Sequence, residues 1–319
     1  MKNLIKILQL IFILICSSAV TAFPDKPIRI IVPFSPGGGT DLVARTISEG
    51  MSRELGQSVV VENRPGAGTT IGTDFVVKSP ADGYTLLLAT FAQAVNPSLI
   101  KNLPYNASRD LIPVAMVGNS PNVLVVPSQS PFQSVADVIA YAQKFPGKLT
   151  YASQGNGTSA HLAGELFISL TKVDMVHIPY KGASQAITDV LGGQVQMTFA
   201  TASAAANLVR GGKLKALAVT TKERSASWPN TPTMIEAGVK DYGMESWYGV
   251  CAPVGTPREI VMKLNAAVSA ATKTRFFTSK LEEEGLMARA ASPESFGQYI
   301  KQEELRWEKI IQAAKIRLD

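Results

Sequence analysis

Cysteine and histidine are scarce in this sequence of 319 residues, which contains two of each. The cysteines are Cys16 and Cys251, and the histidines are His161 and His177. Zinc sites draw most of their ligands from these two residue types, so a His/Cys metal site is hard to assemble. His161 and Glu165 stand one helical turn apart, but no second histidine completes an H-E-x-x-H motif. We therefore expect no bound metal and no cofactor.

Clusters of basic residues interleaved with aromatics are also missing, although the formal net charge is +6. Such clusters are typical of nucleic-acid-binding proteins, so nucleic acid is not an expected partner. A mild and scattered positive charge instead favours the attraction of small anions. Beyond residue 22, no apolar run approaches the roughly 20 residues that a membrane-spanning helix needs.

The first 22 residues have the pattern of a signal peptide, with Lys2 and Lys6 before an apolar run at 8–15 and small residues at 20–22. We therefore predict export to the periplasm. Removing this segment takes two lysines from the net charge of +6 and leaves +4. It also leaves Cys251 as the single cysteine, which excludes an intrachain disulfide. A lipoprotein anchored at Cys16 is the alternative, although the bulky Ile15 before it fits that processing poorly.

Strand-like and helix-like segments alternate along the rest of the chain. Strands at 28–32, 59–62 and 85–89 alternate with helices at 42–55 and 70–78, which indicates a parallel α/β sheet. A second region repeats the order. Its helices are expected at 134–145, 160–170, 183–191 and 203–210, and its strands at 149–152, 175–178, 196–199 and 216–219. A mature chain of this length is typical of two domains.

The segment GNSPN (118–122) separates two extended runs and is a plausible point for the chain to leave one domain. An apolar strand near 247–252 is expected to bring the chain back to the first domain. We therefore assign 23–123 plus 246–319 to domain 1 and 124–245 to domain 2. The C-terminal part is predicted to be helical. Thr256 is expected to cap one helix with Pro257 at its first position, and Ser292 with Pro293 opens the last helix in a similar way.

Two glycine-rich loops each stand between a strand and a helix. They are PFSPGGGTD (33–41) and SQGNGTSAH (153–161). Glycines leave backbone N–H groups accessible, and helix N-termini attract anions. Open α/β sheets bind ligands at the carboxyl ends of their strands. Either loop alone is equally consistent with a tight turn, but the pair favours a clamp with one loop on each domain.

Nucleotide binding is the obvious competitor, and the residues argue against it. A phosphate loop needs a lysine, whereas the first loop ends in Asp41, which would repel polyphosphate. A third loop, ENRPGAGTTIG (62–72), misses the dinucleotide fingerprint by one residue. We interpret it as a turn that starts a helix packed close to the sheet.

Catalytic motifs are few. There is no G-x-S-x-G elbow, although Ser159 lies near His161 in the sequence. The favoured interpretation of His161 is a polar residue in the first helical turn whose ring bonds a neighbouring loop. Lys181 is either a cation at the rim of the cleft or a solvated side chain. The three tryptophans, Trp228, Trp247 and Trp307, are expected in core or hinge packing.

A series of motifs resembles the Bug family, the extracytoplasmic solute receptors of tripartite tricarboxylate transporters. The resemblance covers nearly the whole mature chain in order. The motifs are FPDKPIRIIVPFSPGGGTDLVAR, VVVENRPGAGTTIG, ADGYTLLLAT, YASQGNGTSAHLAGELF, HIPYKGASQAITDVLGGQVQMTF, KLKALAVTTKERS and ESWYGVCAPVGTP.

The resemblance implies a type II periplasmic-binding-protein fold, an α/β fold in which two domains joined by two crossing strands close on a ligand. It implies a monomeric receptor, not an enzyme, that delivers a small carboxylate to a membrane permease. Amides and small hydroxyls of the two loops, with ordered water, would hold the carboxylate. The implied ligand-binding residues are Phe34, Ser35, Pro36, Gly37, Gly38, Gly39, Thr40, Asp41, Thr90, Gln93, Ser153, Gln154, Gly155, Gly157, Thr158, Ser159, His161, Lys181, Gly182, Ala183, Ala200 and Thr201.

The sequence does not distinguish a di- or tricarboxylate from an acidic amino acid or an aromatic acid. Two other functions stay open at this point. One is a ligand-sensing partner of a membrane sensor kinase, and the other is an exported hydrolase that uses Ser159 and His161.

Overall fold

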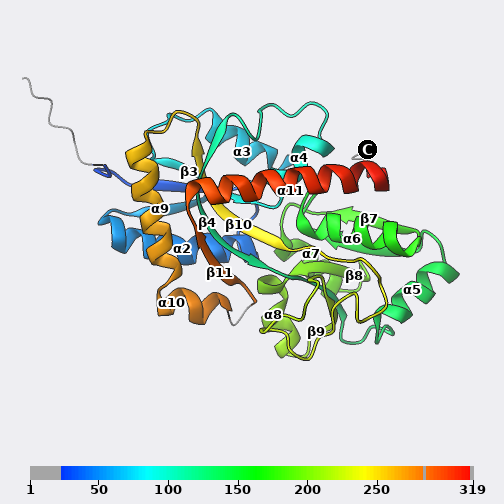
Figure 1. Cartoon of the computed structure of the whole chain (residues 1–319). Coiled ribbons are helices and arrows are strands. Elements are labelled where there is room, and N and C mark those ends of the chain that lie inside the picture. Colours follow the sequence, from blue (N-terminus) through cyan, green and yellow to red (C-terminus); the bar gives the residue numbers. More distant parts are fainter. Residues whose placement is uncertain (1–22, 283–284, 317–319) are drawn as a thin grey trace, which may run out of the picture.

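The computed structural model of the chain describes residues 23–282 and 285–316. The predicted signal peptide, with Cys16, lies outside the described residues. Two sheets form the centres of two units that lie side by side (Figure 1). None of the helices in the described ranges is long and apolar enough to cross a lipid bilayer.

The six-stranded sheet has the order β11-β4-β10-β3-β1-β2. Its strands are β1 (Ile28–Val32), β2 (Val59–Asn63), β3 (Thr85–Thr90), β4 (Leu111–Ser120), β10 (Ser246–Pro253) and β11 (Met287–Ala291). The five-stranded sheet has the order β7-β6-β8-β5-β9. Its strands are β5 (Asn122–Pro127), β6 (Leu149–Ser153), β7 (Met175–Pro179), β8 (Met197–Thr201) and β9 (Leu214–Val219).

Both sheets are mixed, so the prediction of parallel sheets is correct only for part of each. Strand β1 runs parallel to β2 and β3, and β6 runs parallel to β7 and β8. The strands that carry the chain between the units, β4, β5 and β10, are antiparallel to their neighbours. β5 and β10 each enter their sheet from the other unit, so they approach it from the opposite end and run against the strands beside them.

Helices cover both faces of each sheet. On the six-stranded sheet, α2 (Gly39–Leu55) and α9 (Arg258–Thr272) share one buried cluster, while α3 (Thr70–Val77), α4 (Ala92–Leu99) and α11 (Pro293–Ala314) share another. On the five-stranded sheet, α5 (Val135–Lys144) and α6 (Ser159–Thr171) cover one face, and α7 (Ala183–Leu191) and α8 (Ala202–Arg210) the other. The short elements are η1 (Ala67–Thr69), α10 (Arg275–Phe277) and a π-helical turn, η2 (Thr278–Glu282).

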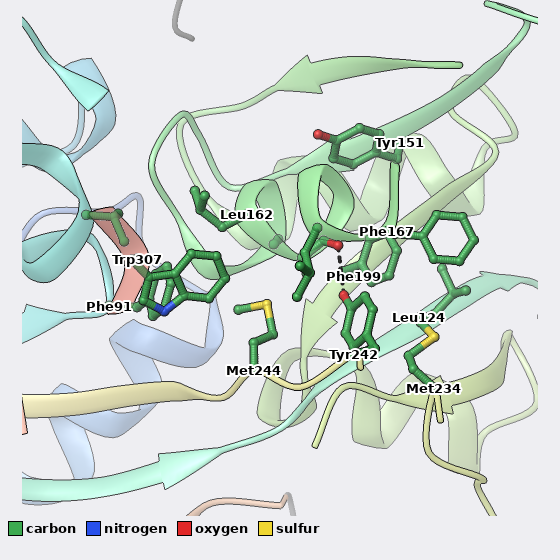
Figure 2. Packing of buried hydrophobic residues seen from close by; sticks show 14 of the residues in the cluster. Phe91, Leu124, Tyr151, Leu162, Phe167, Phe199, Met234, Tyr242, Met244 and Trp307 are labelled. Carbon is green, nitrogen blue, oxygen red and sulfur yellow. Dashed lines mark hydrogen bonds between the residues drawn. The ribbon is translucent and has the colours of Figure 1, made fainter. Parts of the chain in front are cut away.

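One hydrophobic core continues from unit to unit beneath α11, which runs across both of them (Figure 1). The Trp307 ring of α11 packs edge-on against Phe91, with ring centroids 4.9 Å apart. Leu162 and Tyr242 belong to the same cluster, and the Tyr242 hydroxyl donates to the carbonyl of Ala163 at 2.7 Å (Figure 2). The tryptophans Trp228, Trp247 and Trp307 are all buried, as the sequence predicted.

GNSPN lies where the chain passes from one sheet to the other, with only Pro121 between β4 and β5. Two details differ from the sequence-based expectations. Pro257, not Thr256, is the N-cap of α9, because the Thr256 hydroxyl donates to the carbonyl of Pro253 at 2.8 Å. β11 lies where only helix was expected. The Ser292 cap of α11 is confirmed, since its side chain accepts from the Ser295 N–H at 3.2 Å.

Candidate functional site

The two glycine-rich loops lie at the junction between the units. We call residues 34–41, from the loop after β1 into the first turn of α2, the first jaw, and residues 153–161, from the end of β6 into the first turn of α6, the second jaw. The first jaw contacts the loop that follows β7 directly. The Ser35 N–H donates to the Lys181 carbonyl at 3.2 Å, and the Ser184 hydroxyl donates to the Pro36 carbonyl at 3.4 Å. The units are therefore closed on one another here.

Glycines in the first jaw allow this close approach. A Cβ atom on Gly38 would lie 3.3 Å from the Cβ of Ala183, and one on Gly39 would overlap the Oγ of Ser203. A Cβ on Gly182 would lie 3.0 Å from the Cβ of Ser35. The seam between the units is thus built largely from backbone, and a side chain at Gly39 would have to displace the Ser203 hydroxyl.

Several glycine amides are engaged inside their own loops, which differs from the expectation that they are free for an anion. The Gly37 N–H donates to Asp41 Oδ2 at 3.0 Å, and the Gly157 N–H donates to His161 Nδ1 at 3.2 Å. The Gly155 N–H donates to the Ser153 hydroxyl at 3.0 Å.

Asp41 has a clear structural role in the first jaw. It also accepts from Arg45 Nε and Asn63 Nδ2, both at 2.9 Å, and its side chain is buried. Burial alone would raise the pKa of this carboxyl, but the hydrogen bonds from Arg45, Gly37 and Asn63 outweigh it and lower the pKa. Asp41 is therefore an ionised anchor of the loop whose charge Arg45 balances.

A group of buried hydroxyls lies behind the first jaw. The hydroxyls of Thr201, Ser203 and Tyr248 are buried and have no hydrogen-bond partner within the described ranges. Burial raises the pKa of the Tyr248 phenol, although the surrounding hydroxyls of Ser246, Thr201, Ser203 and Thr40 act in the opposite direction. We call Thr40, Thr201, Ser203, Ser246 and Tyr248 the hydroxyl cluster.

The hydroxyl cluster draws on both units. Tyr248 of β10 pairs with Thr90 of β3 in the six-stranded sheet, whereas Thr201 ends β8 of the five-stranded sheet. The N-termini of α2 and α8 meet beside it, because a Cβ on Gly39 would lie 3.4 Å from the Ala204 nitrogen. Neutral hydroxyls and helix N-termini are hydrogen-bond donors that suit an anion. Burying hydroxyls without a partner costs free energy, which an acceptor placed among them would recover.

Sequence reasoning singled out Thr40, Thr90 and Thr201 but missed Ser203, Ser246 and Tyr248. The available signals were weak. Ser203 follows a strand end at the start of α8, and Ser246 and Tyr248 lie in the motif ESWYGV.

Other predicted site residues are placed differently. Phe34 and Ala200 belong to the hydrophobic core. The Gln93 side chain donates to the Ala107 carbonyl at 3.0 Å and lines a separate cavity of about 220 Å³ together with Cys251. It therefore does not join the hydroxyl cluster. The Cys251 thiol is buried, which raises its pKa to about 12.

Two cavities lie where the units meet. One, of about 650 Å³, is lined by Gly68, Gly155, Asn156 and Lys181 among others, and the other, of about 530 Å³, by residues of the first jaw with Ser203. A further cavity of about 580 Å³ lies at the chain crossings and contains none of the predicted site residues. In the part of the chain that the structure describes, no group of three or more His, Cys, Asp or Glu residues could hold a metal ion.

Ser159 and His161 do not form a catalytic pair. His161 Nδ1 is occupied by the Gly157 N–H, and its Nε2 faces Glu165 Oε1 at 3.8 Å. The ring was predicted to bond a neighbouring loop, and it bonds the loop that leads directly into its own helix.

Comparison with known proteins places the chain among receptors. The model of the tripartite tricarboxylate transporter family receptor matches residues 43–316. The structure of the periplasmic binding protein BugD shares 34% identity and a TM-score of 0.89, over 92% of this chain and 99% of that one. Two proteins of Rhodopseudomonas palustris were solved with ligands. Rpa4515 with adipate is 38% identical (TM-score 0.89; 92% and 99% covered), and MatC with bound malate is 32% identical (TM-score 0.87; 91% and 100% covered).

These matches confirm the periplasmic-binding-protein fold and the prediction that the chain is not an enzyme. The family match extends from within α2 past the end of α11, so it includes the second jaw and most of the hydroxyl cluster, while the first jaw and Thr40 precede it. The chain therefore belongs to the tripartite tricarboxylate transporter receptor family, to which the resemblance with the Bug proteins pointed.

Proposed function

We propose that this receptor captures a small carboxylate between its two units in the periplasm and delivers it to the membrane permease of a tripartite tricarboxylate transporter. The hydroxyl cluster is the observation that carries this proposal. It supplies donors from both units at one buried point, and Thr201, Ser203 and Tyr248 lack partners there. A carboxylate is an acceptor of matching chemistry.

The arrangement also suggests how binding closes the protein. An acid that contacts Tyr248 of one unit and Thr201 of the other favours the closed form by its differential affinity for closed over open. In this proposal the domains are 23–123 plus 246–319 and 124–245, and the crossing strands β4–β5 and the segment before β10 are the hinge. The relatives solved with adipate and malate support a dicarboxylate among the candidate ligands.

The direct test has two steps. Native mass spectrometry of protein purified from its own periplasm shows which acid accompanies it. Isothermal titration then measures affinity for adipate, malate, citrate, glutamate and benzoate. A bound acid at a hundredfold excess over Kd should stabilise the fold by about 2.7 kcal/mol. If no acid is retained and none of the five binds, the proposed function is wrong.

Two threonines of β8 form a matched pair for locating the site. The Thr198 hydroxyl donates to the Ala152 carbonyl at 2.8 Å, whereas the Thr201 hydroxyl has no partner among the described residues. Thr201→Val should weaken acid binding by roughly 10- to 100-fold, the equivalent of one hydrogen bond to a charged group, without loss of stability. Thr198→Val should lower stability and leave affinity unchanged. Equal affinity in wild type and Thr201→Val would place the ligand elsewhere.

A further inference from the structure

One of the two histidines in the sequence, His161, belongs to the second jaw, and the other, His177, contacts it through Ser153. His161 is the third residue of α6, and His177 is in β7. Their rings stack with centroids 4.2 Å apart, and His177 also stacks on Tyr151 at 4.9 Å. Each ring is connected to one of the two glycines of this loop.

His161 holds Gly157. The Gly157 backbone has φ +74°, a left-handed conformation, and its N–H donates to His161 Nδ1 at 3.2 Å. A ring nitrogen that accepts a hydrogen bond carries no hydrogen, so His161 is neutral with its proton on Nε2. Nε2 points to Glu165, whose other contact is the Tyr151 hydroxyl at 2.7 Å.

His177 holds Gly155 through Ser153. His177 Nε2 lies 2.7 Å from the Ser153 hydroxyl, and that hydroxyl accepts the Gly155 N–H at 3.0 Å. Gly155 has φ +133°, which also requires glycine. The two imidazoles therefore fix the two points at which the loop backbone leaves ordinary conformations.

The first jaw uses the same construction with a charged group. Gly37 has φ +83°, and its N–H donates to Asp41, which like His161 is the third residue of its helix. Each of these side chains is followed four residues later by a partner, Arg45 or Glu165. The acceptor is an anion with its own counter-ion in the first jaw and a neutral ring in the second.

We propose that His161 and His177 are positioning residues that order the second jaw as neutral rings, His161 by accepting from the Gly157 N–H and His177 through the Ser153 hydroxyl, so that the loop is fixed without bringing negative charge to an anion-binding site. The inference rests on the proposed function for its last part, the benefit to an anion. The ordering of the loop stands independently of the ligand.

The titratable groups that face His161 are consistent with a neutral ring. They are His177 from β7, Glu165 from α6 and Tyr151 from β6. Burial, and then His177, lower the pKa of His161 to about 3, and burial lowers the pKa of His177 to about 4. Both rings therefore stay neutral at the pH values at which an unperturbed histidine titrates.

The first experiment uses wild-type protein labelled with [15N]histidine, in which two ring systems are expected. We expect His161 to carry its hydrogen on Nε2 alone and neither ring to titrate between pH 8 and pH 6. The Gly157 amide should exchange slowly with solvent. A hydrogen on His161 Nδ1, or titration near the ordinary histidine value, overturns the proposal whether or not any acid binds.

The second experiment compares three replacements of His161, with adipate as the probe. Asparagine places an oxygen near the Nδ1 position, so His161→Asn should keep slow exchange at Gly157 and affinity within about threefold of wild type. His161→Asp should keep slow exchange but weaken adipate at least tenfold, because it adds a charge. His161→Leu should lose both.

For His177 the better replacement is expected to be glutamine. Its amide group reaches the position of Nε2, whereas the shorter asparagine does not reach it. His177→Gln should retain slow exchange at Gly155, and His177→Asn should accelerate it. If His161→Leu binds adipate like wild type, or His161→Asp binds as well as His161→Asn, the positioning role is refuted. If wild type binds no acid, the proposed function fails, while the exchange rates still decide the ordering of the loop.

Discussion

Lowering the pH from 7 to 5 is expected to destabilise the folded protein by about 3 to 4 kcal/mol through His161 and His177. The folded-state pKa values, about 3 for His161 and about 4 for His177, lie below the ordinary value of 6.5. Unfolding therefore takes up protons. The stability contributed by the neutral rings is fully present above the unfolded pKa and is lost as the pH falls below it, at about 2 kcal/mol for each ring between pH 7 and pH 5.

Other groups also titrate between pH 7 and pH 5 or below pH 5. The histidine contribution to stability therefore has to be measured as a difference between wild type and a variant that lacks both rings. The pKa of Asp41 is lowered, and its contribution is lost only as the pH falls below the ordinary value of 3.8. Burial raises the pKa values of Glu165 and Glu303, which favours the folded state as the pH falls. These carboxyls remain in the double variant His161→Asn, His177→Gln, so comparison with it isolates the histidines.

The measurement is urea unfolding followed by tryptophan fluorescence at pH 7 and pH 5, because Trp228, Trp247 and Trp307 are all buried. Wild type should lose about 3 kcal/mol more than the double variant between the two pH values. Equal losses would mean that the rings are already protonated in the fold or hardly buried, and the reasoning would be refuted.

Three further outcomes are expected. Gly39→Val should hold the units apart, because its side chain would overlap Ser203 Oγ, and small-angle scattering should then show an expanded protein even with adipate; unchanged scattering would contradict the closed seam. Tyr242→Phe should cost about 1 kcal/mol by removing the buried hydrogen bond to the Ala163 carbonyl, measured by urea unfolding, and no loss would argue against this bond. Ser134→Ala should cost about 1 kcal/mol, because Ser134 and Asp137 form a capping box on α5, and an unchanged midpoint would show that the cap contributes nothing.

Elements with strong local patterns could be predicted from the sequence. The apolar run at β1 and the amphipathic α7 were placed with the bounds that the structure has, Ile28–Val32 and Ala183–Leu191. β11 was missed because it is largely exposed and its sequence, MARAA, has neither β-branched residues nor a clear alternation. GNSPN was interpreted only as the point where the chain leaves one domain, and the sequence did not show that pairing with neighbouring strands on both sides keeps it extended.

The candidate site was predictable only in part, because it is assembled from distant segments. The jaws followed from glycine-rich strand-to-helix junctions, which are local signals. The partners of their amides were not visible, since both Asp41 and His161 act on a residue four positions earlier only after the helix has formed. Tyr248 joins Thr201 and Ser203 through the return of β10 across the molecule, which no spacing in the sequence records.

The position of helix α11 determines when the two units can finish folding during synthesis. The segment 124–245 emerges from the ribosome before α11 exists, yet its buried face with Leu162 shares a core with Trp307. Phe91, much earlier in the chain, meets the same ring. A chain that stops short of Trp307 thus leaves apolar surface uncovered on both units. Both units can therefore complete their folding only after α11 has been synthesised.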